Sequence, residues 1–381
     1  MSFFRKKRFR IILAVIAVVF ALYWLLVNLL VSAALVPSFM RRLESFERIT
    51  KKSYAEQVYT ADLTSNSSVI WNLTNSWVRL AEKEKCEIVS EDGFSLKAML
   101  FPANGAAPDA SDANASTASD AIASTDPDAT ASTAPDADSG SGSGQTGSGN
   151  GQTLRGSKWA VLLHGYTGSK EAMYPIAFWY HRQGYHVLVP DLRCQGESDG
   201  DFIGMGWTDR RDVMQWINEV ILARDPDAQV VLHGLSMGAS CAVMVAGDPD
   251  APACIRAVIA DSAFTDAYSM FRYKIGDWFH LPAFPIVDSA VVALKLRGGY
   301  NLRDASALNA IRNCNVPVLL IHGSRDRFIP SSMAYDLRRA AGPDCDCDVM
   351  LVKGAGHTQA YEKDPTGYFE RVRDLLDRTT N

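Results

Sequence analysis

Residues 230–240 read VVLHGLSMGAS and combine two signals in eleven positions. The apolar, β-branched run at 230–232 is typical of a buried strand, and the helix-forming residues 237–247 follow it directly. Gly234 and Gly238 flank Ser236, so the chain has room for a sharp turn from strand to helix. Ser236 is therefore either a turn residue or a nucleophile presented at the end of a strand.

The rest of the chain repeats the alternation of apolar strands with helices. A β-hairpin is predicted at residues 86–100, where alternating apolar residues flank Asp92-Gly93. Further strands are predicted at residues 159–163, 187–191, 257–260, 318–321 and 349–352, and helices at 170–183, 207–223 and 365–378. Strands that are apolar throughout and separated by helices indicate an α/β fold with a parallel sheet covered on both faces.

A serine hydroxyl becomes a nucleophile only beside a general base that is itself oriented by an acid. Of the seven histidines, His357 lies in a glycine-rich loop just after the last strand, and Asp326 follows the strand before it. Parallel strands bring their carboxyl ends to one edge, so we expect Ser236, Asp326 and His357 to meet there. Asp261 also ends a strand and is the rival acid. We prefer Asp326 because its strand directly precedes the histidine strand.

The oxyanion formed when the serine attacks a carbonyl needs backbone N–H donors. Met237, the residue after the nucleophile, is expected to supply one donor. Tyr166, in the HGYTG turn at residues 164–168, is expected to supply the second. A plain turn would explain HGYTG taken alone. It does not explain why HGYTG occurs together with Ser236, Asp326 and His357.

With these motifs the chain from about Cys86 to the C-terminus resembles the α/β-hydrolase superfamily. The resemblance rests on HGYTG, DLRCQGES at 191–198, GLSMGAS, HGSRDRFIP at 322–330 and GAGH at 354–357. It implies an eight-stranded, mostly parallel sheet with the hairpin at one edge and a small helical cap at 264–310. Within the superfamily the chain is similar to a membrane-anchored, lysophospholipase-like branch of bacterial serine hydrolases.

The expected function is cleavage of a carboxylic ester, either a small-molecule or a lipid-like substrate, through an acyl-enzyme intermediate that needs no cofactor or metal. Two alternatives remain: a peptidase or amidase on the same fold, and a non-catalytic binding protein. The cap is rich in aromatic residues, which fits either an apolar acyl pocket or ordinary packing on the sheet. No signal indicates an oligomeric state.

Composition excludes some partners. The net charge of −5 and the absence of a basic stripe beyond the N-terminus argue against nucleic-acid binding. The seven cysteines have no zinc-ligand spacing, so no structural metal is expected. Cys314 precedes one strand, and Cys345 and Cys347 precede the next. If the domain lies outside the cytoplasm, a disulfide from Cys314 to one of these two cysteines is a hypothesis.

The N-terminus predicts a membrane anchor. Residues 1–10 form a basic tail, and residues 11–36 carry no charge and are long enough to span a bilayer. The positive-inside rule places the tail in the cytoplasm and the catalytic domain on the extracytoplasmic side of the cell membrane. A cleaved signal peptide is the alternative, but its apolar core is usually shorter.

Two further segments connect these parts. Residues 37–85 are predicted to be a membrane-proximal helical segment ahead of the hydrolase domain at 86–381. Residues 103–157 consist almost entirely of small and polar residues, which predicts a disordered insertion.

Overall fold

The computed structural model describes residues 2–37, 65–103 and 156–380, so the expectations for residues 38–64 and 104–155 lie outside the described residues. Its centre is an eight-stranded sheet in the order β1-β2-β4-β3-β5-β6-β7-β8. The strands are β1 Glu84–Val89, β2 Ser95–Phe101, β3 Lys158–Leu163, β4 His186–Pro190, β5 Gln229–Leu235, β6 Ile255–Asp261, β7 Val318–Gly323 and β8 Cys347–Val352. The β1–β2 and β2–β4 pairs are antiparallel and the other pairs are parallel, which confirms the predicted α/β-hydrolase fold with its edge hairpin.

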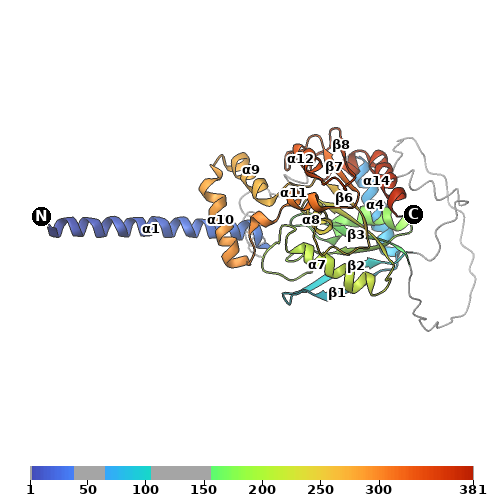
Figure 1. Cartoon of the computed structure of the whole chain (residues 1–381), viewed down its shortest axis with the longest axis horizontal. Helices are drawn as coiled ribbons and strands as arrows, with labels where there is room; N and C mark the ends of the chain where they lie inside the picture. The colour runs from blue at the N-terminus through green and yellow to red at the C-terminus, as the bar shows by residue number, and fades with distance from the viewer. Residues whose placement is uncertain (1, 38–64, 104–155, 381) are drawn as a thin grey trace, which may run out of the picture.

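Helices cover both faces of the sheet (Figure 1). The described helices are α1 Ser2–Leu35, α4 Ser65–Leu80, η1 Lys170–Met173, α6 Tyr174–Arg182, α7 Asp209–Trp216, η2 Ile217–Leu222, α8 Met237–Ala246, α9 Ala267–Phe279, α10 Ala283–Gly298, η3 Leu302–Asp304, α11 Ala307–Ala310, η4 Ile311–Asn313, α12 Ser332–Ala340, α13 Ala360–Lys363 and α14 Pro365–Thr379. One core cluster joins the sheet to α7, α8 and α12, with Trp216 at its centre. A second cluster joins the opposite face to α4, α6 and α14, with Tyr180 and Tyr368 fully buried. Strands buried on both faces explain the continuous apolar runs in the sequence.

The parallel strands β3, β5, β6, β7 and β8 end at the same edge of the sheet. Helix α8 starts directly from β5, and the loops after β3, β7 and β8 close over the same edge. The segment 264–310 contributes α9, α10 and α11 beside this edge. Asp266 caps α9 by accepting a hydrogen bond from the backbone N–H of Ser269 at 2.7 Å.

Helix α1 divides into two parts with different surroundings. Residues 13–22 are exposed and project away from the rest of the molecule (Figure 1). Val27, Val31 and Leu35 are buried in the core cluster that contains Trp216. Leu13–Leu35 has a mean hydropathy of 2.6, and among the described helices it alone is long and apolar enough to cross a membrane.

The described part of the 37–85 segment is α4, which packs against α6. Trp77 places its ring 4.6 Å from that of Phe101 and 5.5 Å from that of Phe178. This helix lies on the opposite side of the molecule from the projecting end of α1 (Figure 1).

The hypothetical disulfide from Cys314 is not formed. The structure has free thiols at all seven cysteines. The Cys314 and Cys345 thiols both donate to the Val316 carbonyl at 3.5 Å, so the two side chains share an acceptor without a disulfide between them.

Candidate active site

Ser236 stands on a strained turn between β5 and α8, with φ 55° and ψ −114°. The two glycines make this turn possible. A Cβ on Gly238 would lie 2.1 Å from the Leu163 carbonyl oxygen, and one on Gly234 would lie 2.2 Å from the Gly238 carbonyl carbon. Both distances are far below van der Waals contact, so only glycine lets β3, β5 and α8 approach this closely.

The structure brings Ser236, Asp326 and His357 together although they come from three different loops. His357 Nε2 lies 2.9 Å from Ser236 Oγ, and His357 Nδ1 lies 2.7 Å from Asp326 Oδ2. When Nδ1–H donates to the carboxylate, Nε2 is left as the acceptor for the serine proton. The arrangement can therefore deprotonate Ser236 as it attacks an electrophile.

Asp326 is a fully buried carboxylate surrounded by hydrogen-bond donors. The backbone N–H groups of Phe328 and Ile329 both donate to its Oδ1 at 2.8 Å. Burial alone would raise the pKa of Asp326, but hydrogen bonds from His322 and His357 outweigh it and hold the pKa below the usual range. The carboxylate therefore stays ionised at neutral pH.

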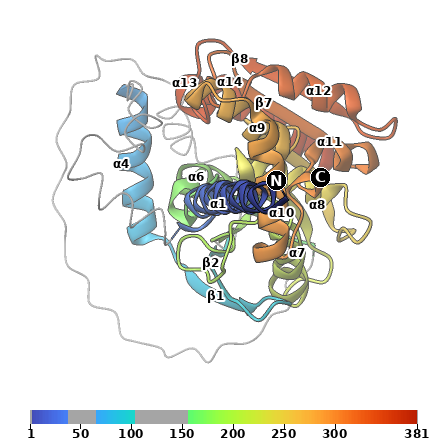
Figure 2. The same cartoon turned by 90° about the vertical axis from the view of Figure 1, so that its left-hand side faces the viewer.

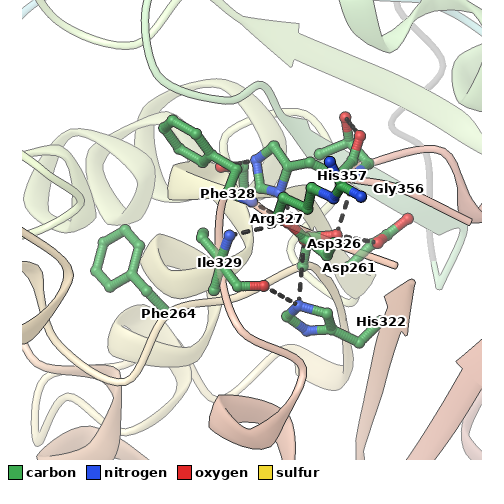
Figure 3. A network of polar contacts seen from close by, with 12 residues as sticks. Asp261, Phe264, His322, Asp326, Arg327, Phe328, Ile329, Gly356 and His357 are labelled. Carbon is green, nitrogen blue, oxygen red and sulfur yellow. Dashed lines mark hydrogen bonds and ion pairs between the residues drawn. The ribbon is translucent and has the colours of Figure 1, made fainter. Parts of the chain in front are cut away.

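His322 is the site residue that sequence reasoning missed. The sequence favoured a core or turn role because His322 lies at the end of a strand. Its Nε2 lies 3.2 Å from Asp326 Oδ2 and 3.0 Å from the Ile329 carbonyl oxygen, so His322 fixes the acid from the side opposite His357 (Figure 3). The available signal was its position four residues before Asp326.

Asp261, the rival acid, supports the site in a different way. Its backbone carbonyl accepts from Ser236 N–H at 2.8 Å, and its Oδ1 accepts from Ser262 Oγ at 2.9 Å. Ser262 Oγ in turn accepts from Thr358 N–H at 3.1 Å. Asp261 therefore connects the serine turn to the loop of His357, while Asp326 holds the histidine ring itself.

The HGYTG turn lies against the nucleophile. A Cβ on Gly165 would lie 3.3 Å from Ser236 Cβ, so the backbone beside Tyr166 is in contact with the serine. The His164 ring fixes this turn, since Nδ1 lies 2.8 Å from the Gly165 carbonyl oxygen and Nε2 accepts from Leu192 N–H at 2.9 Å. Met237 begins α8, where helical N–H groups lack intrahelical partners.

The sequence profile of the alpha/beta hydrolase family matches residues 160–371, which contain all three loops. The chain belongs to the alpha/beta hydrolase family. YqkD of Bacillus subtilis, an uncharacterized protein, is 30% identical over 195 residues, which is 51% of this chain and 63% of YqkD. The chain thus matches less than two thirds of that relative's length.

Solved structures share the fold of this chain at low identity. An esterase of Pyrococcus furiosus superposes with a TM-score of 0.52 at 19% identity, over 79% of this chain and 93% of the esterase. An acylaminoacyl peptidase of Pyrococcus horikoshii superposes with a TM-score of 0.53 at 16% identity, over 81% of this chain and 43% of the peptidase. Identities this low establish the fold of the hydrolase alone.

Backbone strain gathers around the candidate site of the hydrolase. Thr167, Ser236, Ser262 and Thr358 all have φ between 55° and 61°. Each conformation costs about 1–3 kcal/mol for a residue with a Cβ, and the surrounding structure must maintain it. All four residues lie in the loops after β3, β5, β6 and β8 that contact one another at the same edge.

The cap of the hydrolase contacts the loop of the candidate acid. Lys274 of α9 donates to the Arg327 carbonyl at 3.0 Å, and its ammonium lies 4.6 Å from the centre of the Phe328 ring. That ring lies 4.8 Å from the His357 ring. Of the aromatic cap segment, Phe264 and Met270 are buried in the main core, which matches the packing interpretation at these two positions.

Within the described ranges no three His, Cys, Asp or Glu side chains are placed to hold a metal ion.

Proposed function

We propose that this hydrolase is a membrane-anchored serine esterase whose nucleophile, base and acid are Ser236, His357 and Asp326. The observation that carries the proposal is the continuous hydrogen-bonded line from Ser236 Oγ through His357 to the buried Asp326 carboxylate, at 2.9 and 2.7 Å. The strained turn under Ser236 supports the same assignment, because strain of this kind persists at sites where function requires it.

The proposed reaction has two halves. Ser236 Oγ attacks the ester carbonyl carbon while its proton passes to His357 Nε2, and the N–H groups of Met237 and Tyr166 stabilise the oxyanion. The carbon–oxygen bond to the leaving alcohol then breaks, and His357 returns the proton to that alcohol. Water, deprotonated by His357, attacks the acyl-enzyme, releases the carboxylic acid and restores Ser236. Asp326 stabilises the imidazolium in both halves.

Membrane anchoring through α1 belongs to the proposal. The supporting observations are the apolar span Leu13–Leu35 and the cluster of basic residues ahead of it in the sequence. In this arrangement residues 86–381 form an extracytoplasmic hydrolase domain, with a cap at 264–310 and an insertion at 103–157. A domain anchored in this way lies next to membrane lipids, so a lipid-like ester is the proposed substrate class. The resemblance to the lysophospholipase-like branch favours the same class.

A fluorophosphonate probe tests the nucleophile, because it reacts covalently with an activated serine. We expect the full-length protein to be labelled and Ser236→Ala to lose at least 95% of the label, since it removes the attacking oxygen. Ser76→Ala is the matched control, because Ser76 is an exposed serine on α4 remote from the site. Full labelling of folded Ser236→Ala would exclude the assignment, and no labelling of the folded wild type would favour a binding protein.

The peptidase alternative uses the same three residues, so the probe cannot separate it from an esterase. Matched pairs of substrates, with one acyl group attached as an ester or as an amide, separate the two. We expect kcat/KM for the ester to exceed that for the amide by more than the intrinsic difference in reactivity of the pair. A preference for the amide would favour the peptidase.

A further inference from the structure

Helix α1 is docked on the cap through the polar groups that interrupt its apolar sequence. Arg297 of α10 donates to the backbone carbonyl of Asn28 at 3.0 Å, to Asn28 Oδ1 at 3.3 Å and to Ser32 Oγ at 2.8 Å. Tyr23 Oη and Ser289 Oγ, also from α10, lie 2.8 Å apart. The two clearly polar residues of the apolar segment therefore have partners in the cap.

The same helix ends at the edge of the sheet that carries the candidate site. The Leu35 carbonyl accepts from Ile203 N–H at 2.9 Å, and the Ala34 carbonyl accepts from the phenol of Tyr166. Tyr166 belongs to the proposed oxyanion turn. The anchor and the candidate site are thus in direct contact.

The length of α1 constrains where a membrane can lie. A helix rises about 1.5 Å per residue, and the hydrocarbon core of a bilayer is about 30 Å thick. The uncharged residues 11–22 cover only about 18 Å, which is less than two thirds of that thickness. The remainder must lie along the part of α1 that begins at Tyr23, where α10 packs beside it (Figures 1 and 2).

Apolar side chains are exposed on α10 and on the turn before it. Leu281 in that turn and Phe284, Val292 and Leu296 in α10 expose between 47% and 74% of their surface. Val292 and Leu296 are one turn apart, so they lie on the same face of the helix. In a protein surrounded by water alone these apolar side chains would be hydrated. Exposing them to water beside the apolar helix α1 would cost free energy.

Three polar side chains of α10 pair with other parts of the protein. Asp288 accepts from Tyr268 Oη at 2.9 Å and from Arg303 at 2.6 Å, while Ser289 and Arg297 pair with α1. Lys295 is exposed, and its flexible stem can carry the ammonium toward lipid headgroups. The helix thus combines exposed apolar side chains with polar groups that are paired or can reach the lipid headgroups, as expected at a membrane interface.

We propose that α10 and the turn before it lie in the half of the bilayer nearest the hydrolase domain, with the exposed apolar side chains against lipid acyl chains. The inference rests on α1 being the membrane anchor of the proposed function. It deepens that function, because an immersed cap beside the candidate site favours an ester that resides in the membrane over a water-soluble one. The occupant of the apolar face is lipid, and a second copy of the chain is the competing occupant.

Site-specific photocrosslinking in phosphatidylcholine nanodiscs tests the proposal on the full-length chain. Benzoylphenylalanine is introduced one site at a time at Phe284 and Leu296 in the cap and at Leu22 in α1. Leu80 is the matched control, because it is an apolar side chain, 88% exposed, at the end of α4 and away from α1. Mass spectrometry after illumination measures the fraction of protein that gains one lipid molecule.

We expect lipid adducts at Phe284 and Leu296 at no less than half the yield at Leu22, and at least tenfold less at Leu80. Adducts at Leu22 without adducts at the two cap positions would overturn the immersion of α10 while leaving the anchor intact. Protein–protein adducts at the cap positions would assign the face to a second copy. No lipid adduct at Leu22 would overturn the anchor and the inference together. Fluorophosphonate labelling of the same samples reports the proposed catalytic function separately from all these outcomes.

Discussion

Asp326 illustrates how a carboxylate becomes suited to orient a histidine. Four donors reach it: the rings of His322 and His357 and the backbone N–H groups of Phe328 and Ile329. An ionised carboxylate buried without such donors would shift its pKa upward and become neutral. The donors keep the charge in place and fix both oxygens, so the direction of the His357 ring is fixed as well. In the proposed site His322 accordingly acts through Asp326, as a positioning residue.

His322→Leu tests this role, because it removes the N–H donor and replaces the ring with an apolar side chain of similar size. We expect kcat on a model ester to fall about 10-fold to 100-fold with KM changed less than twofold, because a misplaced base slows the chemical step. His322→Gln is the control, since its amide can reach Asp326 from the position of Nε2. Recovery of most of kcat in the glutamine variant is expected. Equal losses in both variants, in proportion to a loss of thermal stability, would point to packing instead.

Elements with strong local patterns could be predicted from the sequence. The apolar runs predicted six strands of the sheet, and five of them are buried on both faces, where a strand must be apolar throughout. The sixth, β8, is a half-buried edge strand. The meeting of Ser236, Asp326 and His357 could be predicted as well, because parallel strands end at one edge.

Contacts between distant segments could not be predicted in this way. Asn28 and Ser32 interrupt the apolar run of α1, and no local pattern points to their partner Arg297, which is more than 260 residues away. His322 looked like a core residue because its acceptor appears only when the loop after β7 turns back. The spacing of apolar residues in the local sequence predicts helices and strands. The roles of these polar residues depend instead on which helices and strands pack together.

The junction between β5 and α8 gives a prediction at the scale of the element. Gly238→Ala places a methyl group 2.1 Å from the Leu163 carbonyl oxygen, so β3 and α8 must move apart. We expect fluorophosphonate labelling to fall at least 100-fold and stability to fall by about 1–3 kcal/mol, as for other overpacked sites.

Gly276→Ala is the matched control for this variant. Gly276 lies inside α9, and a Cβ there meets no other atom within 4 Å. This variant is expected to keep its labelling and to gain about 0.5–1 kcal/mol, because alanine favours the helix over glycine. Normal labelling by Gly238→Ala would show that the close approach of α8 to β3 is dispensable.

The stability of the whole molecule depends on pH through carboxylic acids buried in its core. Burial, together with the charge of Asp212, raises the pKa of Asp209 to about 7. Burial also raises the pKa of Asp261 to about 6, against the hydrogen bond from Ser262. An aspartic acid in the unfolded chain has a pKa of about 3.9. Between pH 4 and these raised values the folded protein holds protons that the unfolded chain has released, so the free energy of unfolding falls as pH rises. Asp326, with its lowered pKa, acts in the opposite direction and only below about pH 4.

Asp209→Asn separates the contribution of one buried acid from the rest of the molecule. Asparagine has nearly the shape of the protonated acid and does not ionise, and its side-chain oxygen can still accept from Gly206 N–H, which lies 2.8 Å from Asp209 Oδ2. Relative to the wild type, the variant should gain about 2–3 kcal/mol of stability when pH rises from 5 to 8, because only the wild type must ionise a buried carboxyl in this window. Urea unfolding in detergent micelles at the two pH values, followed by tryptophan fluorescence, measures the difference.

Asp227→Asn, at an exposed position, is the control and should show no such gain. A variant whose stability relative to wild type is the same at pH 5 and pH 8 would mean that Asp209 is already ionised in the folded protein at pH 5.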